Sequence, residues 1–265
     1  KITFLFFCFL NFSGFGQVQK EIFCPVIQDA TIYKGAKTTP FGDQKNLVCY
    51  PQSSSHKRRF LVKFDIPAFP AGTKIISAQI HLRLSGISGG SKTKIKVHRF
   101  TKDWKENTVV WKGFSNKFDK PHTDSREVVW AYVVGSDHTW DVTQDVQAIA
   151  NGSVSNFGWL FKEAKKNGIS CSFYSKDNGS LFPQLIVTYE EPIIPSIDIT
   201  KTQTNISCKG SNDGEANVSV TGGNNSGYTY TWTPNPGTGQ GTNTISNLSP
   251  GSWTLKVEDA VDNSI

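Results

Sequence analysis

The chain has 265 residues, of which 37% are hydrophobic and 19% charged, so it can bury a core and is not a disordered segment. Its 28 basic residues exceed its 22 acidic ones by 6, which favours an anionic partner. A content of 23 Gly, 18 Phe, 7 Trp and 7 Tyr favours a β-rich fold over a helical one.

Residues 1–16, KITFLFFCFLNFSGFG, predict a secretory signal peptide. A cationic start precedes an apolar run and then small residues, and the run is too short to span a bilayer. Because the chain contains no Met and begins inside this run, we expect it to be truncated at its N-terminus. The protein is therefore predicted to be secreted or at the cell surface, with no membrane span in this fragment.

Export permits disulfides, and the cysteine spacing matches no zinc motif. Four cysteines remain after the signal, and they allow three pairings. We expect one bridge among Cys24, Cys49 and Cys171, with Cys208 left over.

Alternating apolar residues predict a series of short strands, separated by turns such as SGISGGS and DNGS. Strands are expected within 58–65, 77–86, 93–100, 126–134, 156–163 and 183–190. The buried faces of the first three carry Phe60, Val62, Phe64, Ile80, Leu82, Leu84, Ile95 and Val97. Many short strands of this kind are typical of an antiparallel β-sandwich.

One helix is expected within 141–152. Asp141 or Thr143 can cap its start, Val146 and Ile149 face inward, and Gly152 ends it.

The faces opposite the core of three consecutive strands are rich in cations. If these strands are neighbours, their side chains form one basic field that suits an anionic ligand. The alternative interpretation is a solvated sheet face that guards against aggregation. The candidate binding residues of the field are Arg59, Lys63, His81, Arg83, Lys96 and His98, with Lys94 beside them.

Aromatic rings bind sugars by stacking on their C–H faces. Trp140 and Trp159 share strand faces with apolar residues, which assigns them to the core. Trp130 and Tyr132 lie on one face of their strand and are the candidate sugar-binding platform.

A domain boundary is predicted at the proline-rich stretch 192–199. The preceding domain, 17–191, carries 24 basic and 16 acidic residues, whereas the tail after Ser196 carries three basic and six acidic ones. A basic domain is therefore joined to an acidic one. We expect no nucleic-acid partner, since export argues against it and no recognition motif is present.

Residues 24–190 resemble the DNRLRE-type domain, also described as carbohydrate-binding module family 96 and akin to disaggregatase-related domains. The resemblance rests on DATIYKG (29–35), RRFLVKFDIPAFPAG (58–72), VHRFTKDWKENTVVW (97–111), DVTQDVQAI (141–149) and the closing FPQLIVTY (182–189). It implies a non-catalytic jelly-roll β-sandwich, some of whose relatives bind uronate polymers. The sequence departs from the pattern at Lys176, where an acidic residue is expected.

The tail, 200–265, resembles the SprB-type repeat of the surface adhesins of gliding Bacteroidota. The matching marks include Asp213-Gly214, Gly222-Gly223 and Tyr228-x-Tyr230-x-Trp232. The resemblance implies a small Ig-like β-sandwich used as a stalk, truncated at its C-terminus and followed by further repeats or domains in the same chain.

Neither a catalytic motif nor a cofactor motif is found. Asp103 and Glu106 could be considered as a glycosidase pair, but their offset places them on opposite faces of a strand. Asp29, Asp43 and Asp177 could hold a structural calcium through oxygen ligands, and no other metal or cofactor is expected.

Three functions remain open. The first is a secreted module that binds polysaccharide, of acidic, uronate-type chemistry. The second is an adhesin spacer with no ligand of its own, and the third is the binding part of a longer polysaccharide-degrading enzyme.

Overall fold

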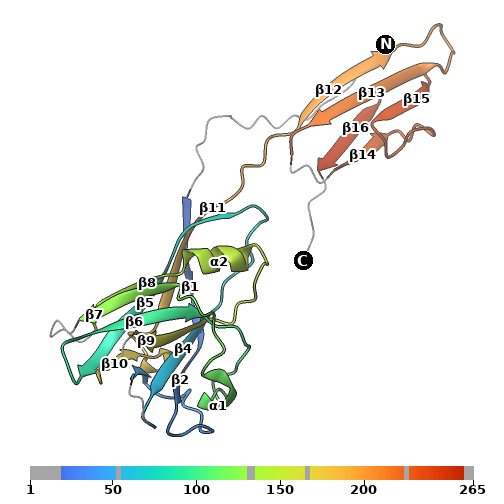
Figure 1. Cartoon of the computed structure of the whole chain (residues 1–265). Coiled ribbons are helices and arrows are strands. Elements are labelled where there is room, and N and C mark those ends of the chain that lie inside the picture. The colour runs from blue at the N-terminus through green and yellow to red at the C-terminus, as the bar shows by residue number, and fades with distance from the viewer. Residues whose placement is uncertain (1–18, 52–54, 130–134, 165–167, 224–226, 260–265) are drawn as a thin grey trace. The chain divides into compact units, whose positions relative to one another are not determined.

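The computed structural model describes residues 19–51, 55–129, 135–164, 168–223 and 227–259. Close contacts divide the chain into two compact units, one spanning Gln17–Pro192 and the other taking in the chain from Ile193 onward. Strands dominate both units, with only short helical segments among the described residues (Figure 1). The predicted all-β sandwich fold is confirmed.

Six strands form one sheet of the first unit, in the order β1-β11-β5-β10-β3, with β8 also paired to β5. Every pairing is antiparallel. Their bounds are β1 Gln19–Cys24, β3 Asn46–Cys49, β5 Lys74–Ser88, β8 Asp137–Asp141, β10 Ser170–Tyr174 and β11 Gln184–Glu190. The 15-residue β5 joins this sheet together, because it pairs with β11, β8 and β10 along its length.

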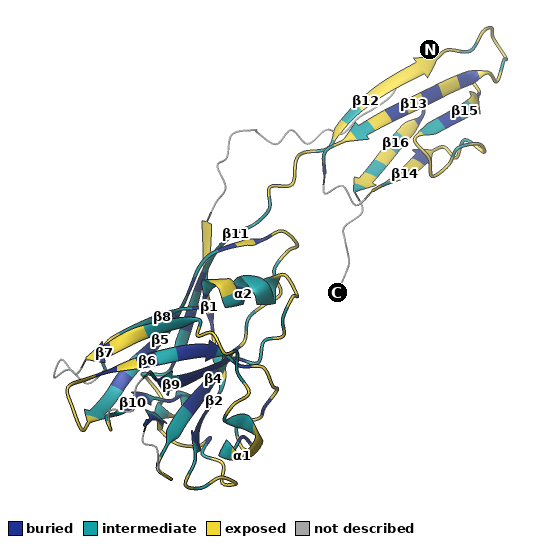
Figure 2. Ribbon diagram, viewed as in Figure 1, coloured by how far each residue is buried: buried dark blue, intermediate teal, exposed yellow. Residues whose placement is uncertain are grey.

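Five strands form the second sheet of this unit, in the order β2-β4-β9-β6-β7, again antiparallel. Their bounds are β2 Val26–Tyr33, β4 Arg58–Phe64, β6 Lys92–Arg99, β7 Asp124–Val129 and β9 Trp159–Glu163. The core lies between the two sheets, as the buried strand segments in Figure 2 show.

The predicted alternation is confirmed by burial. Every apolar residue assigned to a core face in the first three strands is fully buried, and so are Trp140 and Trp159. Aromatic rings fill the centre of this core: Phe60 stacks on Phe161 with ring centroids 4.7 Å apart, and Trp140 meets Phe161 edge-on at 5.3 Å.

A second buried cluster covers part of the outer face of the five-stranded sheet. Leu61 and Leu160 point away from the core, yet both are fully buried, together with Phe100 and Trp104. These two aromatic residues belong to the long connection between β6 and β7, which also contains the short helix α1 (Trp111–Phe114). The indole nitrogen of Trp104 donates to the carbonyl oxygen of Phe157 at 2.8 Å. This connection therefore forms a partial third layer.

The expected helix is α2, Thr143–Ala150. The carboxylate of Asp141 accepts a hydrogen bond from the backbone N–H of Thr143 at 2.9 Å, which satisfies one donor at the helix start. Val146 is fully buried, Ile149 packs against the core, and Gly152 follows the helix with a φ of 67°. The inward face and the end of this helix agree with the prediction, whereas the cap position is occupied by Val142 and not by Asp141 or Thr143.

The four cysteines of the described residues are free thiols. Cys49 and Cys171 are direct cross-strand partners on β3 and β10, yet no bridge joins them, so the expected disulfide is absent from the structure. Cys24 is buried as well, and burial raises the pKa of its thiol to about 11, whereas Cys208 is exposed. The three buried thiols are thus protonated and unreactive at neutral pH.

The second unit is a small sandwich of two antiparallel sheets. One sheet has the order β12-β13-β15, and the other pairs β14 with β16. The bounds are β12 Asp198–Thr204, β13 Gly214–Thr221, β14 Tyr228–Thr233, β15 Thr244–Leu248 and β16 Thr254–Asp259. Trp232, Ile245 and Leu248 are the centre of its own core. Across the described residues of the whole chain, no helix has the length and apolar character needed to cross a bilayer.

Candidate functional site

The three cationic strands belong to two different sheets. Strands β4 and β6 lie in the five-stranded sheet with β9 between them, whereas β5 lies in the six-stranded sheet. The prediction of one basic field on three neighbouring strands is therefore wrong. Alternation shows which side of a strand is buried, but it carries no information on the sheet that the strand joins. The candidate residues divide into Arg59, Lys63, Lys96 and His98 on the five-stranded sheet and His81 and Arg83 on the other.

His81 and Arg83 share a carboxylate on the neighbouring strand β8. Nδ1 of His81 lies 2.7 Å from Oδ2 of Asp137, and Nε of Arg83 lies 3.7 Å from Oδ1. The positive charge on this sheet is thus partly neutralised within the protein.

Three cations lie in one row across adjacent strands of the five-stranded sheet. Phe60 of β4 lies opposite Phe161 of β9, so their neighbours Arg59 and Lys162 meet on the outer face. Lys162 is in turn the register partner of Lys96 on β6. Arg59, Lys162 and Lys96 are called the basic row. Neighbouring strands lie about 4.8 Å apart, so the positive charges repeat at this order of spacing.

The basic row is electrostatically crowded. The pKa of the Lys162 ammonium is lowered by partial burial and by the positive charges of Arg59 and Lys96. Nearby carboxylates are paired with other cations, since Asp119 bonds Arg99 at 2.6 Å and Glu127 bonds Lys92 at 3.3 Å. None of the ion pairs among the described residues includes a member of the basic row. The row thus carries positive charge that an external anion can meet.

Aromatic rings from the third layer lie against the basic row. The guanidinium carbon of Arg59 lies 5.2 Å from the ring centroid of Trp111 and 5.5 Å from that of Phe118. The ammonium groups of Lys162 and Lys120 lie 5.0 and 5.7 Å from the Phe118 centroid. Arg59 also donates to the carbonyl oxygen of Ser115. Both aromatic rings are half-buried, so each presents part of its surface to solvent.

Two predicted binding residues of this sheet, Lys63 and His98, do not offer an exposed, unpaired positive charge. Lys63 pairs with Asp103 at 3.4 Å, and its side chain is only 16% exposed. His98 is on the expected face but is buried under Phe118, with ring centroids 4.7 Å apart. Burial lowers the pKa of His98, so the ring is neutral at pH 7, and Nδ1 donates to the carbonyl oxygen of Asp119 at 2.9 Å.

The other predictions have mixed outcomes. Trp130 and Tyr132 lie outside the described residues, so their role as a platform stays a prediction. Lys162 was missed because its strand is apolar on both faces and gave no signal of an outer side. The cations at Arg59 and Lys96 were predicted, but their alignment with Lys162 follows only from the register.

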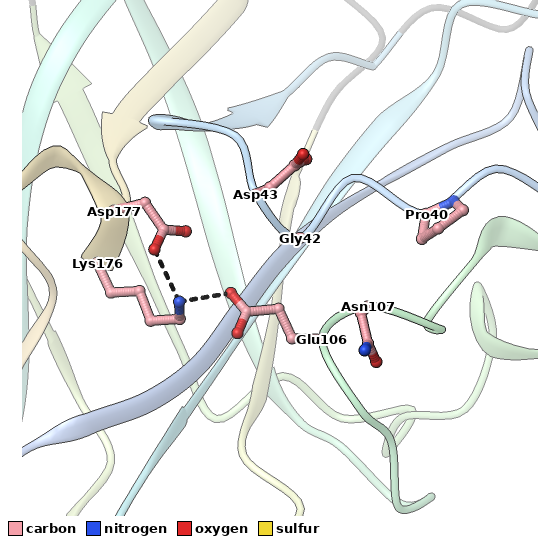
Figure 3. A pocket seen from close by; sticks show the side chains of 7 residues that line it. All are labelled: Pro40, Gly42, Asp43, Glu106, Asn107, Lys176 and Asp177. Carbon is pink, nitrogen blue, oxygen red and sulfur yellow. Dashed lines mark hydrogen bonds and ion pairs between the residues drawn. The ribbon is translucent and has the colours of Figure 1, made fainter.

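A second polar site lies where β2 meets the long connection and the segment after β10. A pocket of about 350 Å³ lies there. Its lining includes Asp43, Glu106, Lys176 and Asp177 (Figure 3). Gly42 shapes this pocket, because a Cβ at this position would lie 2.4 Å from Cγ of Glu106. Only glycine permits such a close approach of the two segments.

Hydrogen bonds and ion pairs fix the acidic residues of this pocket. The side chain of Gln28 accepts from the backbone N–H of Glu106 at 3.0 Å. Asp177 is the middle residue of a short 3-10 helix, η1 (Lys176–Asn178), and its backbone N–H donates to the hydroxyl of Ser175 at 3.2 Å. The ammonium of Lys176 pairs with Glu106 at 3.0 Å and with Asp177 at 2.9 Å.

Asp29 of β2 lies beneath this pocket and is fully buried. Its Oδ2 accepts from the backbone N–H of Lys176 at 2.6 Å, whereas Oδ1 has no hydrogen-bond partner. Burial raises the pKa of this carboxyl to about 7. Carboxylate oxygens of Asp29, Glu106 and Asp177 all lie within 4.8 Å of one another. Of the aspartates predicted to share a metal, two meet here, while Asp43 lines the pocket outside this group.

The model of carbohydrate-binding module family 96 matches residues 21–189, and that of the SprB repeat matches residues 200–237. The two matches occur in the predicted order. No curated protein is similar enough to be counted as a relative.

Both families are non-catalytic, and together they point to an extracellular or surface protein. The first match covers well over half of the chain and takes in both sheets of the larger unit. The basic row and the acidic pocket both lie within it. The chain therefore belongs to carbohydrate-binding module family 96.

Proposed function

We propose that this protein is a secreted or surface-attached module that binds an anionic polysaccharide of the uronate type across the basic row. The observation that carries the proposal is the alignment of Arg59, Lys162 and Lys96 on adjacent strands, where none of them forms an ion pair with a described carboxylate. A polyuronate carries one carboxylate on each sugar. A row of cations can therefore meet several successive sugars of one chain.

The electrostatics favour this ligand. Like charges held close together raise the free energy of the unbound protein. The pKa of Lys162 is lowered mainly by partial burial, and the positive charges of Arg59 and Lys96 lower it further. An anionic chain relieves the repulsion when it binds. Phe118 supplies an apolar surface beside the cations, on which the C–H face of a sugar can pack.

Affinity electrophoresis tests the proposal. Migration of the protein is compared in gels that contain alginate, polygalacturonate or a neutral glucan. We expect retardation in the two acidic gels only, and we expect added salt to reduce it, because salt screens exposed charges over about 10 Å at 0.1 M.

Matched variants locate the surface. The double substitution of Lys96→Gln and Lys162→Gln removes two exposed ion pairs with the ligand, each worth about 0.2–1 kcal/mol, so affinity should fall by roughly 2- to 30-fold. Lys74→Gln is the control, because this exposed lysine carries the same charge on the other sheet. Arg83→Gln should also leave binding unchanged, since Arg83 faces Asp137 on β8.

Two results would contradict the proposal in different ways. Equal retardation in neutral and acidic gels would retain a carbohydrate-binding role but remove the acidic specificity. Equal mobility in every gel would leave the second candidate function, a spacer of a surface adhesin without its own ligand. The SprB match at residues 200–237 is the observation that favours that candidate. The third candidate, the binding part of a longer enzyme, is compatible with retardation and is decided by the full-length gene.

A further inference from the structure

We propose that Asp29, Glu106 and Asp177 form a binding site for a divalent cation, and that its cation is Ca²⁺. The inference starts from Asp29, a fully buried carboxylate with one oxygen that has no hydrogen-bond partner. An ionised carboxylate in this state is unfavourable unless a cation compensates it. The unpartnered group lies within 4.8 Å of two more carboxylates.

The geometry of the three carboxylates suits a calcium ion. Ca²⁺ holds oxygen ligands at 2.3–2.6 Å, so oxygens on opposite sides of the ion lie up to about 5 Å apart. The mutual distances in this cluster fall within that limit. All three ligands are carboxylates, which excludes the nitrogen and sulfur ligands that zinc prefers. Mg²⁺ demands a near-ideal octahedron, whereas Ca²⁺ accepts an irregular set completed by water.

The protein supplies one internal cation, and that cation leaves Asp29 uncompensated. The ammonium of Lys176 pairs with Glu106 and Asp177, as Figure 3 shows, while Asp29 receives only the backbone N–H of Lys176. Asp43 adds a further carboxylate to the pocket wall. The ammonium therefore pairs with two carboxylates and leaves that of Asp29 without a cation.

Lys176 is thus the internal competitor of the metal. Its side chain is on the pocket rim and 25% exposed, so it can turn toward solvent when a divalent ion enters. The three ligands come from β2, from the long connection and from η1, which are far apart in sequence. An ion held between them joins these segments and stabilises the folded state over the unfolded chain, which has no such site.

Thermal unfolding of the full chain tests this site without any polysaccharide. The unfolding midpoint is compared in excess EDTA and in excess CaCl₂. At a free concentration of about 100 times the dissociation constant, we expect the midpoint to rise by roughly 5–10 °C. Calorimetric titration of the EDTA-treated protein with CaCl₂ should show binding that Asp29→Asn removes.

Three variants separate the metal site from other effects. Asp29→Asn and Glu106→Gln should abolish the calcium-dependent rise, even if their midpoints in EDTA differ from that of the wild type. Asp103→Asn is the matched control from the same connection; its side chain is 67% exposed and pairs with Lys63, so the rise should persist. Lys176→Gln should increase calcium affinity, because it removes the competing ammonium.

The opposite pattern would overturn the inference. If CaCl₂ leaves the wild-type midpoint unchanged, or if Asp29→Asn responds as the wild type does, the three carboxylates are not a calcium site. If, in addition, Lys176→Gln lowers the midpoint equally in EDTA and in CaCl₂, Lys176 is itself the permanent cation of the cluster. Retardation in polysaccharide gels is a separate measurement, so the failure of either proposal leaves the other standing.

Discussion

At the scale of single residues, the larger β-sandwich buries ionisable side chains in its core, where most sandwiches have apolar ones. Glu163 ends β9 with its side chain on the core side, where it is only 8% exposed and one carboxyl oxygen has no hydrogen-bond partner. Burial raises the pKa of this carboxyl to about 7, although the positive charges of Arg59 and Lys57 act in the opposite direction. The thiol of Cys49 also contacts it. Glu163 is therefore largely protonated in the folded protein below neutral pH.

This shift makes stability depend on pH with a defined sign. The folded-state pKa of Glu163 lies above its ordinary value of 4.5, so the folded protein binds the proton more tightly than the unfolded chain. The stabilisation is complete below pH 4.5 and is lost as pH rises toward about 7. Over that window the loss is at most about 3 kcal/mol.

Glu163→Gln tests this by keeping the shape and removing the titration. The free energy of unfolding, measured in urea with EDTA at several pH values, should fall less steeply with pH in the variant than in the wild type. Comparison of the two curves cancels the contribution of Asp29, which has the same sign. Parallel curves between pH 5 and pH 8 would contradict the assignment.

At the scale of elements, the sequence predicted strands better than it predicted their neighbours. The alternation of Phe60, Val62 and Phe64 was sufficient to place β4 and to identify its buried side. Helix α2 was also predictable, because capping, an inward face and a final glycine coincide within twelve residues. These signals are local in sequence, so they can be recognised without knowledge of the tertiary structure.

Local sequence patterns could not predict which strands pair or which segments cover the sheets. Strands β4 and β5 follow each other in the chain but lie in opposite sheets, which separates Arg59 from Arg83. Leu61 alternates with Arg59 and Lys63 and was expected on an open face, yet the connection that carries Trp104 covers it. The acidic pocket was only half predicted, since Glu106 enters it from that same connection. Long-range contacts decide each of these features.

The junction of β4 and β9 provides a prediction at this scale. Gly158 precedes β9 with a φ of 76°, and a Cβ there would lie 2.2 Å from the carbonyl oxygen of Val62. In Gly158→Ala, the alanine would therefore be strained twice: by its left-handed backbone conformation and by a clash with the neighbouring strand. We expect the free energy of unfolding, measured in urea, to fall by roughly 2–4 kcal/mol.

Gly152→Ala is a control for the backbone effect alone. Gly152 has a φ of 67°, but nothing lies within 4 Å of its added Cβ. Its loss should be limited to about 1 kcal/mol. If both variants lose the same free energy of unfolding, β4 can shift to make room for the added methyl group, and the close approach at Gly158 does not limit stability.

At the scale of the whole molecule, the chain has two compact units with separate cores, and the proposed function assigns binding to the first and support to the second. The basic row and the acidic pocket belong to the first unit, and the core around Trp232 belongs to the second. The charges differ in the same way, because the chain after Ser196 has three basic and six acidic residues. An acidic segment does not compete for the polyanion proposed to bind the first unit, which is consistent with a supporting role.

Trp232→Ala separates the two roles. Trp232 is 1% exposed, and its indole nitrogen donates to the carbonyl oxygen of Thr242 at 2.9 Å. Removal of a buried tryptophan costs about 3–5 kcal/mol, which is comparable to the whole stability of so small a sandwich. Calorimetry should therefore show the loss of one unfolding transition, while the calcium-dependent transition of the first unit persists. Thr231→Ala, an exposed neighbour on the same strand, should retain both transitions.

Retardation by alginate in the Trp232→Ala variant then decides where binding resides. If the basic row is the binding surface, retardation persists, because the row owes its geometry to the register of β4, β9 and β6 and not to the second core. A loss of retardation together with the second transition would assign binding to the repeat, or to both units acting together. Since the repeat carries an excess of carboxylates, such a result would also contradict the electrostatic basis of the proposed function.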